Sequence, residues 1–101
     1  MKLKNSEWLR HKKIASSYEY ELTGLIAFLN EAYSYGTLNA KRSEQENLKS
    51  LEKHQIDYFL FFKCKKPFIK RECSEEIPLY LKNKPLVYKD EALNLFIYKL
   101  R

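Results

Sequence analysis

The sequence predicts an α+β fold, in which a helical region (about residues 6–35 and 44–55) packs on a small antiparallel sheet formed by residues 56–100. Two observations support this class. Apolar residues recur at steps of three and four through the first third of the chain, whereas short aromatic-rich runs separated by polar residues and Pro follow residue 55. The chain has 101 residues and no linker-like stretch, which predicts a single domain over residues 1–101.

The first helical stretch is predicted from a stripe of apolar and aromatic positions. Ser6 is a suitable N-cap, and Gly36 follows the last periodic residue, where helices commonly end. Ser16 and Glu19 also have the spacing of a capping box, so one bent helix or two consecutive helices fit the pattern. The stripe consists of Trp8, His11, Ala15, Tyr18, Leu22, Leu25, Leu29 and Ala32, widened by Ile14, Ile26 and Tyr33.

The second helix begins with a clearer signal. Ser43 and Glu46 form a capping box, and Leu48 and Leu51 then share one helix face. From Ile56 to Phe62 the chain is apolar on both faces apart from Asp57, which favours a buried central strand over a continuation of the helix.

The remaining strands are short. Residues 68–71 are expected to form a second strand, and residues 77–81 and 86–88 a hairpin with a loop longer than two residues. The last segment, residues 90–100, is ambiguous. Alternation of Leu93, Leu95 and Ile97 favours a final strand, and a helix is the alternative.

Composition indicates the compartment. No uninterrupted apolar run is longer than that from Tyr58 to Phe62, which is too short to span a bilayer, and charged residues occupy the positions where a secretory signal would be apolar. The two cysteines, Cys64 and Cys73, are interpreted as free thiols, because small secreted domains usually carry several disulfides. We therefore expect an intracellular, cytoplasmic protein that does not bind a membrane.

No motif identifies a reaction, a metal or a cofactor. The soft metal ligands His11, His54, Cys64 and Cys73 lack the close pairs that zinc sites use, and the chain has too few glycines for a phosphate loop. A metal-free nuclease-like toxin could use His54 as a base with Tyr58 nearby, but no spacing selects this arrangement. We expect no catalytic residues, no bound metal and no cofactor.

One segment combines positive charge with aromatic rings. The net charge is +6, yet only four of the nineteen basic residues are Arg, the side chain best suited to bidentate phosphate contacts. A hairpin tip whose lysines serve only to discourage aggregation would have a similar composition. The candidate nucleic-acid-binding residues are Lys63, Lys65, Lys66, Phe68, Lys70 and Arg71.

Tyrosine is the other unusual feature. The chain has eight Tyr, and Tyr20 and Tyr35 lie off the apolar stripe, so we expect both to be exposed. Tyr is enriched in protein interfaces because it gives a large contact area at low entropic cost. The sequence therefore favours a small non-enzymatic protein that binds a protein partner through Tyr20 and Tyr35, such as an inhibitor, immunity protein or antitoxin from a mobile element or phage. Nucleic-acid binding is the first alternative and a nuclease-like toxin the second.

Overall fold

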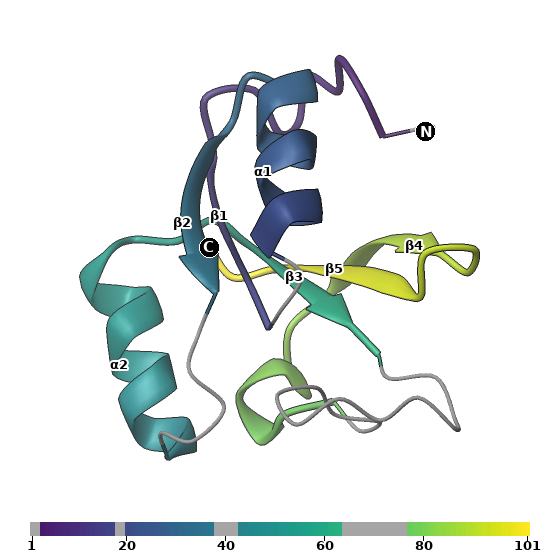
Figure 1. Cartoon of the computed structure of the whole chain (residues 1–101). Coiled ribbons are helices and arrows are strands. Elements are labelled where there is room, and N and C mark those ends of the chain that lie inside the picture. The colour runs from purple at the N-terminus through teal and green to yellow at the C-terminus, as the bar shows by residue number, and fades with distance from the viewer. Residues whose placement is uncertain (1–2, 18–19, 38–42, 64–76) are drawn as a thin grey trace.

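The computed structural model describes residues 3–17, 20–37, 43–63 and 77–101 (Figure 1). Among these residues, five strands form one sheet in the order β2-β1-β3-β5-β4. The strands are β1 (Lys13–Ser16), β2 (Tyr33–Thr37), β3 (Tyr58–Phe62), β4 (Leu86–Asp90) and β5 (Leu95–Lys99). The helices are α1 (Tyr20–Leu29), α2 (Glu44–Lys53) and the short 3₁₀ helix η1 (Leu79–Leu81).

The sheet is mixed. β1 runs parallel to both β2 and β3, whereas β3 pairs antiparallel with β5, and β5 pairs antiparallel with β4. The α+β class is confirmed, and the strands within residues 56–100 pair antiparallel with one another as expected, although β3 also pairs in parallel with β1. The sheet is larger than predicted, because two parallel strands come from the region assigned to helix.

The prediction of helix throughout residues 6–35 is wrong outside α1. Residues 7–11 form turns, and His11 has a φ of +61°, which interrupts any helix that approaches from Ser6. Ile14 then pairs with Ser34 on one side and with Tyr58 on the other. Hydrogen bonds to two strands distant in sequence thus override a local helical spacing.

The C-terminal hairpin also differs from the expected one. Residues 79–81 form η1 instead of a strand, and the hairpin consists of β4 and β5 joined by a turn at residues 91–94. In that turn the Leu93 backbone N–H donates to Asp90 Oδ1 at 3.2 Å. The final segment is a strand, as the alternation predicted, whereas the strand expected at 68–71 lies outside the described residues.

The two α-helices, α1 and α2, end in the same way. The Glu31 backbone has a φ of +53° just after α1, and the Gln55 backbone has a φ of +54° just after α2. The next residue donates back into the helix, from Ala32 N–H to Ala27 O at 2.9 Å and from Ile56 N–H to Leu51 O at 3.0 Å. This is the Schellman arrangement, which turns the chain sharply into β2 and towards β3.

The start of α2 follows the predicted capping box. The Ser43 hydroxyl accepts a hydrogen bond from the Glu46 backbone N–H at 3.2 Å. Within the described residues, no helix has the length and apolar character needed to cross a bilayer.

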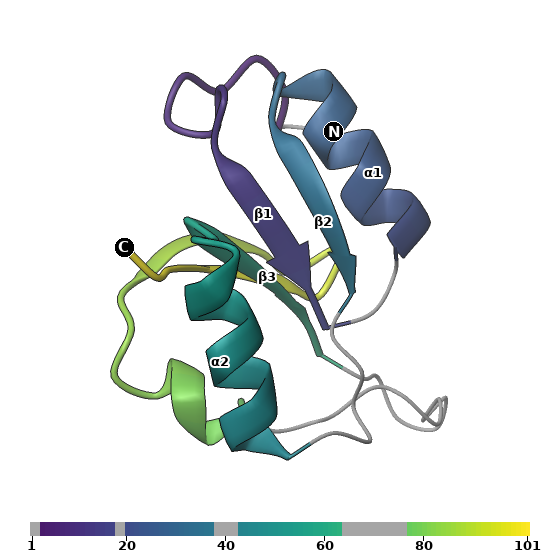
Figure 2. The same ribbon diagram turned by 90° about the vertical axis from the view of Figure 1, so that its left-hand side faces the viewer.

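The helices cover opposite faces of the sheet (Figures 1 and 2). On one face, α1 and the N-terminal segment pack on a core that includes Ile14, Leu60 and Ile97. On the other, α2 and η1 pack on Ala15, Phe59 and Phe61. The strand β3 is buried on both faces, as its continuous apolar sequence predicts.

Candidate functional site

The face of the sheet that carries α2 is not covered at its outer edge. Lys13 on β1 lies in register with Tyr33 on β2, and Tyr35 lies two residues further along the same face. Although large aromatic side chains are usually buried, those of Tyr33 and Tyr35 are 57% and 49% exposed. We call the group formed by His11, Lys13, Tyr33, Tyr35 and His54 the β2 aromatic surface.

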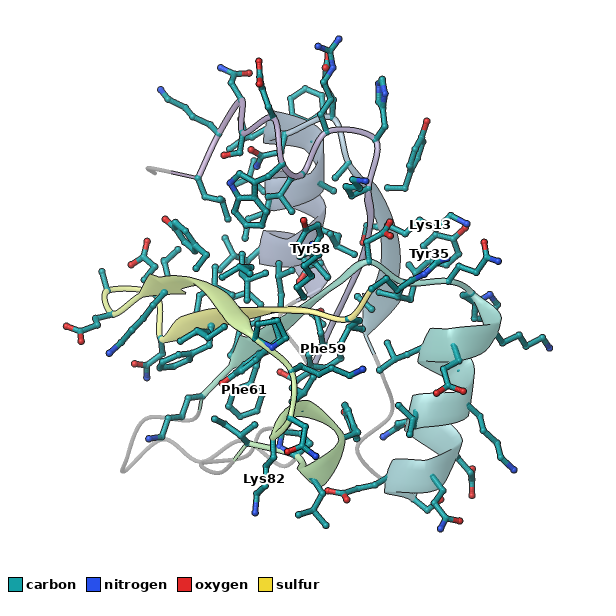
Figure 3. All side chains as sticks on the ribbon, turned by 180° about the vertical axis from the view of Figure 1, so that it is seen from behind. Lys13, Tyr35, Tyr58, Phe59, Phe61 and Lys82 are labelled. Carbon is teal, nitrogen blue, oxygen red and sulfur yellow. The ribbon has the colours of Figure 1, made fainter. Side chains whose placement is uncertain are left out.

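Tyr35 lies at the centre of this surface. Its ring centroid is 5.6 Å from that of His54, the C-cap residue of α2, and the planes are inclined by 38°. The ammonium of Lys13 lies 5.7 Å from the Tyr35 ring centroid, within the range of a cation–π contact. Figure 3 shows the Lys13 and Tyr35 side chains next to each other near the end of α2. Tyr35 is therefore held in place by contacts from two other elements.

A second ring pair extends the surface along β2. The His11 ring lies 6.4 Å from the Tyr33 ring, with an interplanar angle of 31°. His11 reaches this position because its backbone N–H donates to Glu31 O at 2.8 Å, immediately before β2 begins. An exposed ion pair, Arg10 Nε to Glu31 Oε2 at 2.8 Å, borders the surface at this end.

The backbone beneath the surface is fixed by Asp57. The carboxylate Oδ2 of Asp57 accepts from the Lys13 backbone N–H at 2.9 Å, and the Asp57 N–H donates to Lys13 O at 2.8 Å. These bonds join the start of β1 to the residue before β3. The surface is thus presented by a hydrogen-bonded sheet and is preformed.

The outer edge of β2 offers few free backbone groups. Tyr33 N–H donates to Lys12 O, so in a parallel ladder Tyr33 directs its backbone groups towards β1 and Ser34 directs its groups outwards, and the regular alternation is then broken by a register shift before Thr37. The Gly36 N–H donates to the Ser34 hydroxyl at 3.3 Å, and Gly36 has a φ of +81°. Among the described residues this edge is therefore too short for an added strand, and recognition would use side chains.

The structure places the sequence-predicted site residues in different regions. Tyr35 is exposed on β2, whereas Tyr20 is the first residue of α1, and its side chain lies outside what the structure describes. Lys63 is exposed directly after β3, where its backbone N–H donates to Asn94 O at 3.0 Å. The other basic-segment candidates lie outside the described residues. They are Lys65, Lys66, Phe68, Lys70 and Arg71.

The residue pair suggested for a nuclease is not assembled. Tyr58 is buried on the α1 face, where its ring lies 5.1 Å from Trp8, whereas His54 is exposed at the end of α2 on the opposite face. Burial, with a further contribution from the charge of Asp57, raises the pKa of the Tyr58 phenol. The described residues contain no cluster of three His, Cys, Asp or Glu side chains suited to a metal ion.

Lys13 and Tyr33 are members of the surface that sequence reasoning missed. Tyr33 was placed on the core-facing stripe of a helix, and that placement is wrong. The Tyr-Ser-Tyr pattern was the available signal, because alternate residues of a strand share one face. Comparison with known proteins found no matching family, no similar curated protein and no similar solved structure.

Proposed function

We propose that this protein is a small non-enzymatic binding module that recognises a protein partner through the β2 aromatic surface. The observation that carries the proposal is that two half-exposed tyrosines, Tyr33 and Tyr35, lie on the face of the sheet whose centre is packed by α2 and η1. Contiguous exposed aromatic side chains are typical of protein interfaces, and Tyr is among the residues enriched there.

The contacts around these tyrosines support the same function. Ring contacts with His11 and His54 and the ammonium of Lys13 restrict the Tyr33 and Tyr35 side chains before a partner arrives. Binding to a preorganised surface loses less side-chain entropy than binding to a mobile one. Such a surface suits an inhibitor, immunity protein or antitoxin from a mobile element or phage, acting in the cytoplasm, because these proteins work by occupying a partner's surface.

Nucleic-acid binding through the segment Lys63–Arg71 is the second candidate function. The parallel strands β1, β2 and β3 have their C-terminal ends on the same side of the sheet, and Lys63 directly follows β3 there (Figure 2). Open α/β sheets bind ligands beyond the carboxyl ends of their parallel strands, which favours a role for the basic residues that follow Lys63 in sequence. A nuclease-like toxin has less support, because His54 and Tyr58 lie on opposite faces.

A capture experiment tests the first proposal. The tagged full chain is incubated with lysate of the native host, with and without nuclease, alongside Tyr35→Ala and Phe28→Ala variants. Phe28 is the matched control, because it is an aromatic residue that is 80% exposed on α1, on the other side of the sheet. We expect one defined protein partner that survives nuclease treatment, and a yield reduced about tenfold by Tyr35→Ala but not by Phe28→Ala.

Loss of the recovered proteins on nuclease treatment would contradict a protein partner. In that case the nucleic-acid candidate predicts that affinity falls steeply with salt, and that Lys65→Ala with Lys66→Ala makes this dependence shallower. Equal losses from Tyr35→Ala and Phe28→Ala would show that the β2 aromatic surface is not the interface.

A further inference from the structure

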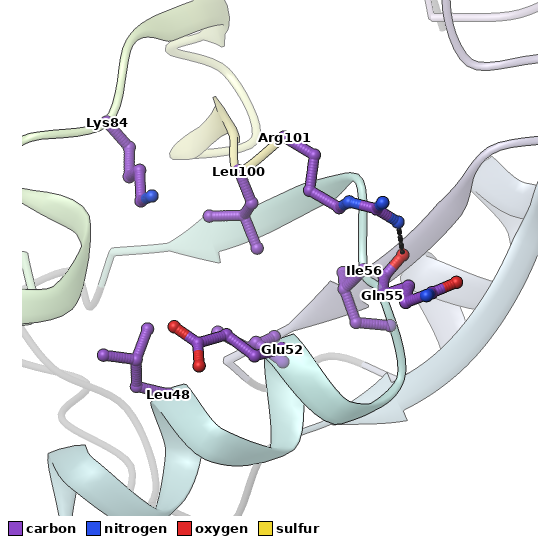
Figure 4. Close-up of a pocket in the computed structure, with 8 residues that line it drawn as sticks. Leu48, Glu52, Gln55, Ile56, Lys84, Leu100 and Arg101 are labelled. Carbon is purple, nitrogen blue, oxygen red and sulfur yellow. Dashed lines mark hydrogen bonds between the residues drawn. The ribbon is translucent and has the colours of Figure 1, made fainter.

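A pocket of about 260 Å³ lies between the C-terminal half of α2 and the chain that follows β5 (Figure 4). Its floor is apolar and consists of Leu48, Leu51, Ile56 and Leu100. Pockets for drug-sized ligands occupy roughly 300–1,000 Å³, so this volume suits a smaller, metabolite-sized molecule.

Charges of both signs stand around this apolar floor. Glu52 projects from α2, whereas Lys84 and Arg101 come from the two chain segments on the other side of the pocket (Figure 4). Among the described residues, no ion pair of 4.0 Å or less joins Glu52 to Lys84 or Arg101. Glu52 and the basic side chains Lys84 and Arg101 therefore line the same pocket without forming an ion pair with one another.

Two of these charged residues lie near the C-terminal end of α2. Glu52 is in the last turn of the helix. Arg101 Nη1 donates to Gln55 O at 3.3 Å, which holds the guanidinium at the rim. A guanidinium has five N–H donors, so this bond leaves others available for an anion.

We propose that the pocket binds a free α-amino acid with an apolar side chain. The ligand's ammonium group pairs with Glu52, its carboxylate pairs with Lys84 and Arg101, and its side chain covers the part of the floor formed by the partly exposed Leu48 and Leu100. A zwitterion is the complementary ligand because it brings one charge of each sign together with an apolar group. This site is separate from the β2 aromatic surface, so the proposal does not depend on the proposed function.

Titrations of the full chain followed by amide NMR test the assignment. L-Leucine is compared with 4-methylpentanoate, which lacks the ammonium group, and with 3-methylbutylamine, which lacks the carboxylate. We expect L-leucine to bind with a dissociation constant of about 1 mM and to shift the Leu51, Gln55 and Leu100 amides. Each analogue should bind about fivefold to tenfold more weakly, because one charge of the pocket is left unpaired.

Two variants assign the charges separately. Glu52→Gln should abolish the preference for L-leucine over 4-methylpentanoate, and Lys84→Gln should reduce the preference over 3-methylbutylamine. Glu46→Gln and Lys53→Gln are matched controls on α2, because neither residue lines the pocket, and both should bind like the wild type. The amide spectra of all variants also report whether the fold is intact.

Either of two results with the wild-type protein would overturn the assignment. One is equal binding of all three ligands, which indicates adsorption to apolar surface alone. The other is the absence of any amide shift with L-leucine at about 10 mM, ten times the expected dissociation constant. Unchanged selectivity in Glu52→Gln, with a wild-type spectrum otherwise, would equally remove Glu52 from the site.

Discussion

Gln55 ends α2 in a backbone conformation that glycine adopts at a lower cost. Its φ of +54° lies in the left-handed region, where a Cβ atom crowds the following carbonyl. The position uses only backbone groups, since the Gln55 N–H donates to Glu52 O at 3.1 Å and its carbonyl accepts from Arg101. Glycine would keep these bonds and remove the strain.

We therefore expect Gln55→Gly to increase the free energy of unfolding by about 0.5–1 kcal/mol, measured by urea denaturation. Lys49→Gly is the control, because Lys49 is exposed in the middle of α2, and glycine there should decrease stability by about 1 kcal/mol. A decrease in both variants would mean that α2 does not end in the left-handed turn at Gln55.

At this scale the sequence predicted one residue of the β2 aromatic surface and misjudged another. Tyr35 was expected to be exposed because it lay off a helical stripe, and it is exposed, although it lies on a strand. Tyr33 was assigned to the buried side of that stripe, and this was wrong, because alternate residues of a strand share a face and Tyr33 points the same way as Tyr35. The contact of Tyr35 with His54 could not be predicted, since it depends on where α2 ends relative to β2.

Among the elements, two with local signals were predicted correctly, whereas the N-cap predicted at Ser6 begins no helix. The capping box at Ser43 located α2, and the continuous apolar run located β3. The strand β1 carried no such signal, because four residues are too few to show alternation, and its partners β2 and β3 lie far away in sequence. The apolar residues around β1 have helical spacing, but this segment forms a strand because it pairs with β2 and β3.

The packing of η1 against α2 and the sheet makes stability sensitive to high pH. Glu44 Oε1 accepts from the Leu79 backbone N–H at 3.0 Å, and the adjacent Tyr80 ring lies 5.9 Å from the Phe59 ring at an interplanar angle of 86°. Burial, and to a smaller extent the charge of Glu44, raises the pKa of Tyr80 to about 12. The folded state therefore resists loss of the phenolic proton that the unfolded chain releases near its ordinary pKa of 10.0.

The stabilising contribution of a neutral Tyr80 should be complete below pH 10 and should be lost as the pH rises from about 10 to about 12. The free energy of unfolding is measured by urea denaturation at pH 9 and pH 11.5. We expect its decrease between these two pH values to be about 2 kcal/mol smaller in Tyr80→Phe than in the wild type. Tyr33→Phe, which alters an exposed ring, should follow the wild type. A Tyr80→Phe curve parallel to the wild type would show that Tyr80 is not buried against Phe59.

At the scale of the whole molecule, the two crossover connections determine where the surfaces lie. The chain moves from β1 to β2 in one direction and from β2 back across β1 to β3 in the other. Two crossover connections of the same hand that run in opposite directions across a sheet place their helices on opposite faces. In this protein α1 and α2 do lie on opposite faces of the sheet. Because α2 returns towards β3, it leaves the β2 end of its face open, and the β2 aromatic surface occupies that end.

This topology makes β1 central to stability despite its length. Ile14 has no exposed surface, and it lies between β2 and β3 in a core shared with α1. Leu86, in contrast, is 48% exposed on the edge strand β4. We expect Ile14→Ala to decrease the free energy of unfolding by about 3–4 kcal/mol and Leu86→Ala by less than about 1 kcal/mol, measured by urea denaturation. Similar small losses in the two variants would contradict the placement of residues 13–16 inside the sheet.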